Sequence, residues 1–360
     1  MKDSTSLSAS SQRKFVVLGG CGAIGRVVVR DLFESHRHNH ILIADYNEKS
    51  ARAYAKSFGS RRVRAAFADA RRPDLRGHAV VINCTQHDFN VRVMRAALQA
   101  GVHYLDLGGL FHHTRRQLKL DRRFRRAGLT AILGMGCSPG ITNVMTRAAV
   151  ERLGSAKSVK IRVGTKDLNP PAETFCFPYS AQTIVEEFTL TPWIVEGGKF
   201  REVKPRTAWE LVKFPKPVGP QWLVRTRHSE IATLPVTFKL RHCDFKVGFD
   251  RAFVGELVKR MKAGWTVRDF AKLPAPRGKP NDYEIARVIV DGLVFDCHAR
   301  ANKRWHASAG DIDTGCPPSI VAQMIATGKI TQRGVLAPEV AVPVEPFFEE
   351  LRKRGMEVRS

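Results

Sequence analysis

The chain has 360 residues, 43% of them hydrophobic and 26% charged, which is typical of globular proteins and long enough for two domains. Its formal net charge of +25 would suit nucleic-acid binding, but the basic residues are spread along the chain without a nucleic-acid motif. We therefore expect no specific nucleic-acid partner, and the lack of any run near the roughly 18 apolar residues of a membrane helix predicts no membrane partner.

The first twelve residues and the cysteines indicate the compartment. Residues 1–12 are polar and rich in serine, which predicts a disordered tail of a cytoplasmic protein rather than a signal peptide. The seven cysteines are scattered and include no Cys-x-x-Cys pair, so neither a disulfide framework nor a structural zinc site is indicated. We expect reduced, mostly buried cysteines and no bound metal.

Short apolar runs alternate with segments of helical periodicity from Lys14 to about residue 142. This alternation favours an α/β fold with a doubly wound parallel sheet, and we assign residues 13–142 to a Rossmann dinucleotide-binding domain. The densest basic segment, Arg115 to Arg126, is predicted to be helical, with its apolar side chains turned inward. Strands are predicted at residues 15–20, 40–47, 63–70, 79–85, 102–109 and 129–136.

The pattern changes after residue 142. Residues 143–310 are rich in β-type segments separated by proline-containing turns, which predicts an α+β substrate domain with a mostly antiparallel sheet. Residues 311–360 return to helical periodicity, and we expect these C-terminal helices to pack back on the Rossmann domain. Strands of the second domain are predicted at 158–167, 174–180 and 236–242, with further β structure across 283–301.

A Gly-x-Gly-x-x-Gly sequence directly follows the first predicted strand and opens a helix. Gly20 is expected to permit the tight turn, Gly22 to let the backbone approach a pyrophosphate, and Gly25 to let the helix pack closely on the strand. The N-terminus of that helix would stabilise the phosphate charge. We therefore predict pyrophosphate contacts from Gly20, Gly22, Ala23, Ile24 and Gly25.

Asp45 lies twenty residues after Gly25, at the end of the second predicted strand. A carboxylate there accepts hydrogen bonds from the adenosine ribose and repels a 2′-phosphate, so NAD is favoured over NADP, although Asn47 and Lys49 nearby leave NADP open. The ends of the next strands should also border the cofactor, because ligands bind at the carboxyl edge of such sheets. Those contacts are predicted from Asp69, Cys84 and Thr85.

Several segments resemble the saccharopine dehydrogenase-like superfamily, namely VLGGCGAIG, VVINCTQHDFNVRVMRAALQAGVHYLDLGG, GMGCSPGITN and TGCPPSIVAQMIATGKITQRGVLAPE. The blocks YSAQTIVEEFT, HSEIATLP and VAVPVEPFFEELRKRGM are most similar to those of lysine 6-dehydrogenases. The resemblance implies an inserted substrate domain, a homo-oligomer, and NAD-dependent oxidation of L-lysine at its ε-carbon. The product would be 2-aminoadipate 6-semialdehyde, which cyclises to piperideine-6-carboxylate, with ammonia released.

Other functions stay open at this point. Relatives within the superfamily include saccharopine dehydrogenases and carboxynorspermidine dehydrogenases. A non-catalytic NAD-binding scaffold or sensor is an alternative of a different class. Binding of NAD without amino-acid-dependent NADH production would identify it.

Hydride leaves an amine carbon readily only when the nitrogen lone pair is free, so the site should contain a base. Asp106, at a strand end, is the first candidate for contact with the reacting amine, and its alternative role is to cap the following turn. His228 is the second candidate, as base or as partner of an α-carboxylate together with Arg225. Tyr179 and Glu186, seven residues apart, would share a helix face, whereas Glu187 would point elsewhere. Further substrate contacts are predicted from Thr233 and Ser138.

Overall fold

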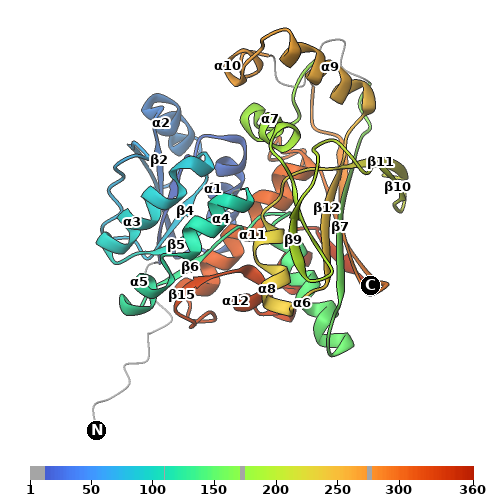
Figure 1. The fold of residues 1–360 in the computed structure, drawn as a ribbon. Coiled ribbons are helices and arrows are strands. Elements are labelled where there is room, and N and C mark those ends of the chain that lie inside the picture. Colours follow the sequence, from blue (N-terminus) through green and yellow to red (C-terminus); the bar gives the residue numbers. More distant parts are fainter. Residues whose placement is uncertain (1–12, 109, 171–174, 274–277) are drawn as a thin grey trace.

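The computed structural model of the protein describes residues 13–108, 110–170, 175–273 and 278–360, so the predicted tail of residues 1–12 lies outside the described part. Two sheets dominate the molecule, and the C-terminal segment contributes one strand to each of them (Figure 1).

The first sheet has seven parallel strands in the order β15-β6-β5-β4-β1-β2-β3, which confirms the predicted doubly wound α/β fold. The apolar residues of its central strands, 15–18 and 80–82, are buried, as expected when helices cover both faces of a parallel sheet. The strands are β1 (Arg13–Leu18), β2 (Asn39–Asp45), β3 (Val63–Phe67), β4 (Val80–Asn83), β5 (His103–Asp106), β6 (Thr130–Ile132) and β15 (Gly334–Leu336).

Helices connect these strands, and the basic segment forms two of them rather than one. Leu120 and Phe124 are buried as predicted and Leu118 is half-buried, while the arginines between and around them are exposed. The helices of this part are α1 (Ala23–Ser35), α2 (Glu48–Lys56), η1 (His87–Phe89), α3 (Asn90–Ala100), α4 (Phe111–Leu118) and α5 (Asp121–Arg126), of which η1 is a 3₁₀ helix.

The second sheet has nine strands and is mostly antiparallel, except that β12 pairs with β7 in parallel. Its main order is β10-β11-β12-β7-β13-β14-β16, and β8 pairs with both β12 and β9. The strands are β7 (Ser158–Asp167), β8 (Trp193–Glu196), β9 (Lys199–Glu202), β10 (Glu210–Lys213), β11 (Pro220–Arg225), β12 (His242–Gly248), β13 (Asp282–Val290), β14 (Leu293–Arg300) and β16 (Glu357–Arg359).

Two predicted strands of this domain differ in the structure. Residues 175–180, the described part of the predicted strand 174–180, form no strand. The first three residues of the predicted strand 236–242 belong to helix α8 (Leu234–Phe238), because Pro235 occupies the first turn, where proline favours a helix start, and only His242 is in a strand. The other helices are α6 (Ile141–Leu153), α7 (Ala181–Thr189), η2 (Glu230–Ala232), α9 (Arg251–Lys262) and α10 (Val267–Phe270).

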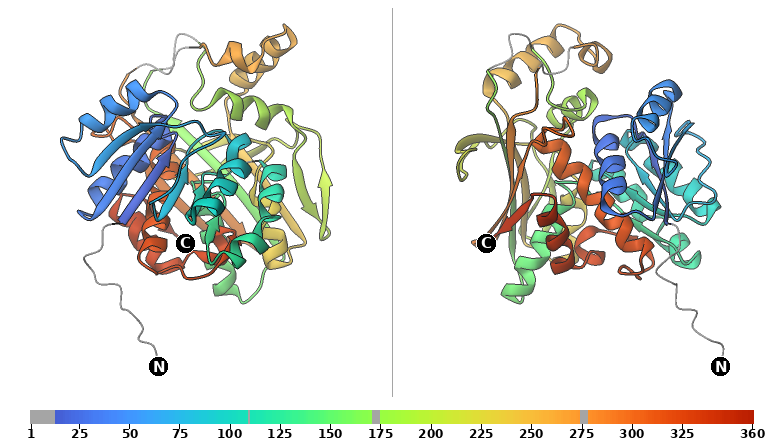
Figure 2. Two further views of the ribbon diagram at one scale, coloured as in Figure 1. Left: turned by 90° about the vertical axis from the view of Figure 1, so that its left-hand side faces the viewer. Right: turned by 180° about the vertical axis from the view of Figure 1, so that it is seen from behind.

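The C-terminal segment joins the two sheets. Helix α11 (Ala309–Ala326) lies between them (Figures 1 and 2) and packs closely on α1, where a Cβ on Gly315 would approach Val27 to 2.6 Å. Strand β15 then extends the first sheet, and β16 returns to the second sheet beside β14, which residue periodicity did not indicate. Between these strands lie α12 (Pro338–Ala341) and α13 (Val344–Lys353).

A buried ion pair fixes this arrangement. Arg354, after α13, lies 2.6 Å from Asp31 of α1, and both side chains are almost fully enclosed. Since an enclosed charge is costly without its partner, this pair holds the C-terminal helices on the Rossmann helices. Among the described helices, none has both the length and the apolar character that a bilayer-spanning segment requires.

Candidate functional site

The glycine loop between β1 and α1 has the geometry of a dinucleotide-binding turn. A Cβ on Gly25 would lie 2.2 Å from the carbonyl oxygen of Gly19, so only glycine lets α1 approach the strand this closely. A Cβ on Gly22 would meet nothing nearer than that same oxygen, at 3.5 Å, and the residue is exposed. The left-handed conformation of the turn falls on Gly19 (φ 78°) rather than on Gly20, which corrects the predicted role of Gly20. Gly20 instead packs against Ile43.

Asp45 lies directly beside this loop. Its Oδ2 accepts a hydrogen bond from the backbone N–H of Cys21 (2.9 Å) and its Oδ1 accepts one from Asn47 (2.9 Å). A carboxylate has about four acceptor positions, so each oxygen has capacity for a ribose hydroxyl. The exposed Ala23 and half-buried Ile24 begin α1, whose first N–H groups point away from the helix body. These residues therefore fit a pyrophosphate and its ribose.

The remaining predicted cofactor residues lie at strand ends of the first sheet. Asp69 follows β3 and pairs with Arg71 (2.6 Å), whose hydrogen bonds lower the pKa of that carboxyl. Cys84 and Thr85 follow β4, and Thr85 Oγ1 donates to Asn83 (2.6 Å). Burial raises the pKa of the Cys84 thiol, so it is protonated at neutral pH. Their contact with a cofactor stays a prediction.

Asp106 is 1% exposed and accepts four hydrogen bonds. Its Oδ1 accepts from the backbone N–H groups of Gly108 (2.9 Å) and Gly134 (2.7 Å). Its Oδ2 accepts from Tyr104 Oη (2.9 Å) and Gln117 Nε2 (2.5 Å). All four acceptor positions of the carboxylate are thus filled by the protein. This geometry favours the turn-stabilising role of Asp106 over the predicted contact with the reacting amine.

His228 lies at the centre of a polar cluster. Its Nδ1 is hydrogen-bonded to Glu230 Oε2, and its ring stacks on Phe245 with centroids 3.7 Å apart. The other oxygen of Glu230 accepts hydrogen bonds from Ser138 and, at 3.0 Å, from Thr142. Ser138 belongs to the loop that follows β6, at the carboxyl edge of the first sheet. The cluster therefore joins the second domain to the edge where dinucleotide ligands bind.

Burial would lower the pKa of His228, but the carboxylates of Glu230 and Glu187 raise it above its ordinary value. Burial would raise the pKa of Glu230, but the adjacent imidazole lowers it, so this carboxyl is ionised at neutral pH. Because Glu230 fixes Nδ1, the Nε2 atom of His228 is the one left to exchange a proton with a substrate. Burial raises the pKa of Glu187.

Tyr179 and Glu186 do not share a helix face as predicted. Helix α7 begins at Ala181, so Tyr179 precedes it, and its Oη donates to Glu187 Oε2 at 2.5 Å. Glu186 points instead toward the first domain, with Oε2 at 2.8 Å from His87 Nε2. The structure thus brings together Tyr179, Glu187 and His228, and it separates Glu186 from them.

Around Arg225, where an anion site was predicted, the arginines contact protein groups, and Arg225 shares Asp244 with Arg162. Arg225 lies 3.6 Å from Asp244, although its Nε is buried without a hydrogen-bond partner among the described residues. Arg227 donates to the carbonyl of Thr191 (2.7 Å) and contacts His112. Thr233, the last predicted substrate contact, is buried where η2 joins α8, so a role in substrate binding stays a prediction.

Sequence reasoning missed Glu230 and a second group of buried carboxyls. Glu230 follows His228 by two residues. Whether two side chains at that spacing form a hydrogen bond depends on the local turn, so the sequence did not indicate this pair. Glu284 of β13 and Asp313 of α11 meet Cys137, whose Sγ lies 3.4 Å from Glu284 Oε1. Burial raises the pKa of both carboxyls.

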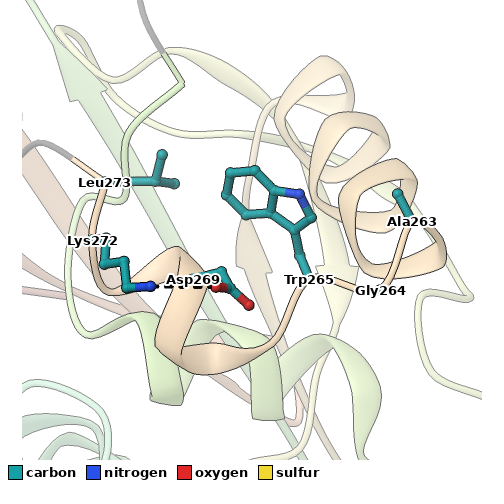
Figure 3. A pocket seen from close by; sticks show the side chains of 6 residues that line it. All are labelled: Ala263, Gly264, Trp265, Asp269, Lys272 and Leu273. Atoms are coloured by element: carbon teal, nitrogen blue, oxygen red, sulfur yellow. Dashed lines mark ion pairs between the residues drawn. The ribbon is translucent and has the colours of Figure 1, made fainter.

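A separate surface hollow at α9 and α10 contains none of the predicted site residues. It is lined by Ala263, Gly264, Trp265, Asp269, Lys272 and Leu273 (Figure 3).

Two family models match the chain. The one described as "Saccharopine dehydrogenase NADP binding domain" matches residues 15–132, and the one described as "Saccharopine dehydrogenase C-terminal domain" matches residues 286–356. Together the two matched segments make up more than half of the chain. The first contains the glycine loop, and the second contains α11 and β15. The chain belongs to the saccharopine dehydrogenase-like superfamily. The match to a nucleotide-binding domain of this family supports an oxidoreductase that uses a nicotinamide cofactor.

Three similar proteins each match most of the chain. Carboxyaminopropylagmatine dehydrogenase of Synechocystis sp. is 24% identical over 95% of this chain and 96% of its own length. Carboxynorspermidine synthase of Vibrio alginolyticus is 24% identical over 79% of this chain and 77% of its own. The solved structure of saccharopine dehydrogenase (L-Glu forming) from Saccharomyces cerevisiae has the same fold, with a TM-score of 0.71, 16% identity, and coverage of 96% and 99% of the two chains. These relatives support the superfamily, but not the narrower likeness to lysine 6-dehydrogenases.

Proposed function

We propose that this protein is an NAD-dependent oxidoreductase of a secondary amine that joins an amino acid to a cationic, polyamine-like chain, with His228 as the acid–base residue. The main support for this proposal is the position of the His228 imidazole. Glu230 holds its Nδ1, and the ring lies near carboxylates where the second domain meets the edge of the Rossmann sheet. Two relatives that match most of the chain have carboxylated polyamine-type compounds in their names.

The chemistry requires one proton acceptor. Oxidation removes a hydride from the carbon and a proton from the nitrogen of the amine, giving an imine that water splits into an amine and a carbonyl compound. A nicotinamide bound at the glycine loop would supply the hydride acceptor, or the hydride donor in the reverse direction. His228 Nε2 takes the nitrogen proton in this direction and returns it in the reverse, reductive direction. Glu230 stabilises the imidazolium that forms and fixes the ring through Nδ1.

The charge of the cluster supports a cationic substrate. Glu187 and Glu230 border His228, although the whole chain has a net charge of +25. Saccharopine has three carboxylates and would require several free cationic groups. Arg225 is paired with Asp244, and the guanidinium of Arg227 is directed to the carbonyl of Thr191. An amine-rich substrate therefore fits these side chains better than a tricarboxylate does.

Asp45 supports NAD as the cofactor. Its carboxylate lies 2.9 Å from the backbone N–H of Cys21 in the glycine loop, so a 2′-phosphate on the bound ribose would be placed against a negative charge. Ribose hydroxyls would instead donate to the two oxygens. A homo-oligomeric assembly stays a prediction of the family resemblance, and a cytoplasmic location stays a prediction from the polar N-terminal residues and the scattered cysteines.

Lysine is the competing substrate, because an ammonium group fits the same carboxylates. The test is an NADH absorbance assay with the purified chain on carboxyaminopropylagmatine, carboxynorspermidine, saccharopine and lysine at equal concentrations. We expect the two carboxylated polyamines to have the highest kcat/KM. Ammonia release with lysine as the best substrate would replace this proposal by lysine deamination. NAD binding without turnover of any of the four would favour a scaffold or sensor.

A further inference from the structure

Strand β11 divides its side chains between the two faces of the second sheet. It pairs antiparallel with its neighbour β12 (Figure 1), with Val224 opposite Val247 and Arg225 opposite Lys246. Residues opposite each other in such a pair point to the same face, and successive residues of one strand point to opposite faces. Arg225 therefore shares a face with Lys246 and with Asp244, which lies 3.6 Å from it.

The next residue, Thr226, points to the other face. Continuing the register by one residue places Thr226 opposite Phe245, the ring on which His228 stacks with centroids 3.7 Å apart. Side chains in opposite positions have Cβ atoms about 4.5–5.5 Å apart. Thr226 is thus a neighbour of the acid–base cluster, whereas Arg225 lies on the opposite face of the sheet.

The hydroxyl of Thr226 is buried and unpaired. Thr226 is 1% exposed, and its Oγ1 has no hydrogen-bond partner among the described residues. Other hydroxyls of the cluster are paired, because Ser138 donates to Glu230 and Tyr179 donates to Glu187. A buried hydroxyl without a partner destabilises a fold, so an unpaired one beside a reactive histidine requires an explanation. Binding of a ligand group supplies one.

Thr226 is enclosed to a degree similar to the residue that the proposed reaction uses. The side chain of His228 is 11% exposed, so a substrate that reaches its Nε2 must displace the cover that also encloses Thr226. Tyr179 is 43% exposed, which gives the cluster a side that is open to solvent. A substrate that enters from that side can therefore contact His228 and Thr226 together.

The hydroxyl supplies an acceptor that a secondary amine needs. An alkyl amine is protonated at neutral pH, so a secondary amine arrives with two N–H bonds. His228 Nε2 accepts one of them. The other requires a second acceptor, because an unpaired N–H is costly in an enclosed site. The oxygen of Thr226 has two lone pairs, and no donor among the described residues occupies them.

We infer that Thr226 is a substrate-binding residue whose Oγ1 accepts an N–H of the reacting amine and orients the nitrogen toward His228. The inference rests on the proposed function, since it requires that His228 exchange a proton with an amine. It replaces the predicted substrate contact of Arg225, which lies on the other face of the sheet.

The test compares the unaltered full chain with Thr226→Val, which keeps the shape of the side chain and removes the hydroxyl. We expect kcat/KM for the best substrate among carboxyaminopropylagmatine, carboxynorspermidine, saccharopine and lysine to fall about 10–100-fold, because a hydrogen bond to a charged group is lost. Tm should rise by about 1–3 °C, because no unpaired hydroxyl stays in the interior. NAD affinity, measured by calorimetry, should not change. Thr226→Ser keeps the hydroxyl and should retain most of the activity.

The matched control is Thr146→Val, which alters a buried threonine of α6 whose hydroxyl donates to the carbonyl of Thr142 at 2.8 Å. This variant should keep the kcat/KM of the unaltered chain and should not gain stability. Normal kcat/KM in Thr226→Val, beside an active unaltered chain, would overturn the inference alone. So would a lower Tm, which would show that the hydroxyl is already paired, or an equal loss of activity in Thr226→Ser. Absence of turnover of all four compounds by the unaltered chain would instead overturn the proposed function, and this inference with it.

Discussion

The nucleotide loop and the acid–base cluster of this protein are built in opposite ways. The loop and Asp45 lie between residues 19 and 45, and their contacts follow from one strand, one turn and one helix. The cluster combines Ser138, Tyr179, Glu187 and His228, which come from both domains. A site made from consecutive elements leaves a pattern in the sequence, whereas a site assembled across domains leaves isolated polar residues.

The two regions also differ in what fixes their geometry. In the loop, steric exclusion fixes the geometry, because any side chain on Gly25 would collide with the backbone of Gly19. In the cluster, the limit is electrostatic, because the buried Glu230 carboxylate requires donors from Ser138, Thr142 and His228. Substitutions should therefore affect packing and binding in the first region, and proton transfer in the second.

The largest effect is expected at the loop. Gly22→Val should abolish NAD binding and leave Tm nearly unchanged, because a Cβ there meets no protein atom closer than 3.5 Å but occupies the place of the pyrophosphate. Gly25→Ala is the paired variant and should also destabilise the fold, by about 1–3 kcal/mol, since its Cβ would collide with Gly19. Calorimetry with NAD and thermal melting separate the two effects. Native NAD affinity in Gly22→Val would contradict the role of this loop.

The second effect is expected at the cluster. His228→Asn should lower kcat/KM by roughly 10²–10⁴-fold per folded molecule, because the general base is lost, while NAD affinity changes little and Tm falls, since Glu230 loses its imidazole partner. The matched control is His242→Asn, which alters an exposed histidine at the start of β12 in the same sheet. Equal activity of the two variants would remove His228 from the mechanism.

A pH profile sharpens this prediction. The carboxylates around His228 raise its pKa, so the imidazolium persists above the ordinary histidine range. Because only the neutral ring accepts a proton, the kcat/KM of amine oxidation should rise as the pH increases through this raised pKa. Reduction of the imine should show the opposite trend. If His228→Asn no longer shows this rise of kcat/KM with pH, the rise is due to His228. If the variant keeps the same pH profile, another group is responsible for the rise.

A smaller effect is expected for Asp106→Asn. The amide has only one acceptor oxygen for the four donors that surround the carboxylate, so we expect a loss of about 1–3 kcal/mol of stability. Turnover per folded molecule should stay near normal. Thermal melting and steady-state kinetics test this. A fall of 10²-fold or more in kcat/KM without a change in Tm would instead indicate that Asp106 takes part in the reaction.

The smallest effect is expected for Asp45→Ser. Removing the carboxylate should weaken NAD binding by about 10-fold, which corresponds to roughly 1.4 kcal/mol, and improve the relative use of NADP. Kinetics with both cofactors measure this change. Asp74→Ser is the control, since Asp74 is an exposed carboxylate of the same domain that pairs with Arg76 (2.7 Å) and belongs to no predicted site. An unchanged preference for NAD over NADP in Asp45→Ser would show that cofactor choice is set elsewhere.

The fold of the first domain was predictable because each element has a local cause. The apolar run of β1 is buried on both faces, the glycine turn requires small residues, and Asp45 ends the next strand, all in chain order. The second domain was predicted less well. Residues 236–242 contain β-forming side chains, but Pro235 begins a helix there, so a local preference was overridden.

The sequence by itself determined the nucleotide-binding half, because the residues that make it are close in the chain and each is required by sterics or by the pattern of burial. It also contained Asp106 and His228, but not their roles. Only the tertiary structure filled every acceptor position of Asp106, placed Glu230 on His228, and turned Glu187 rather than Glu186 toward Tyr179. The reason is that protonation and hydrogen bonding depend on which groups from distant segments are buried together, and residue spacing does not encode that.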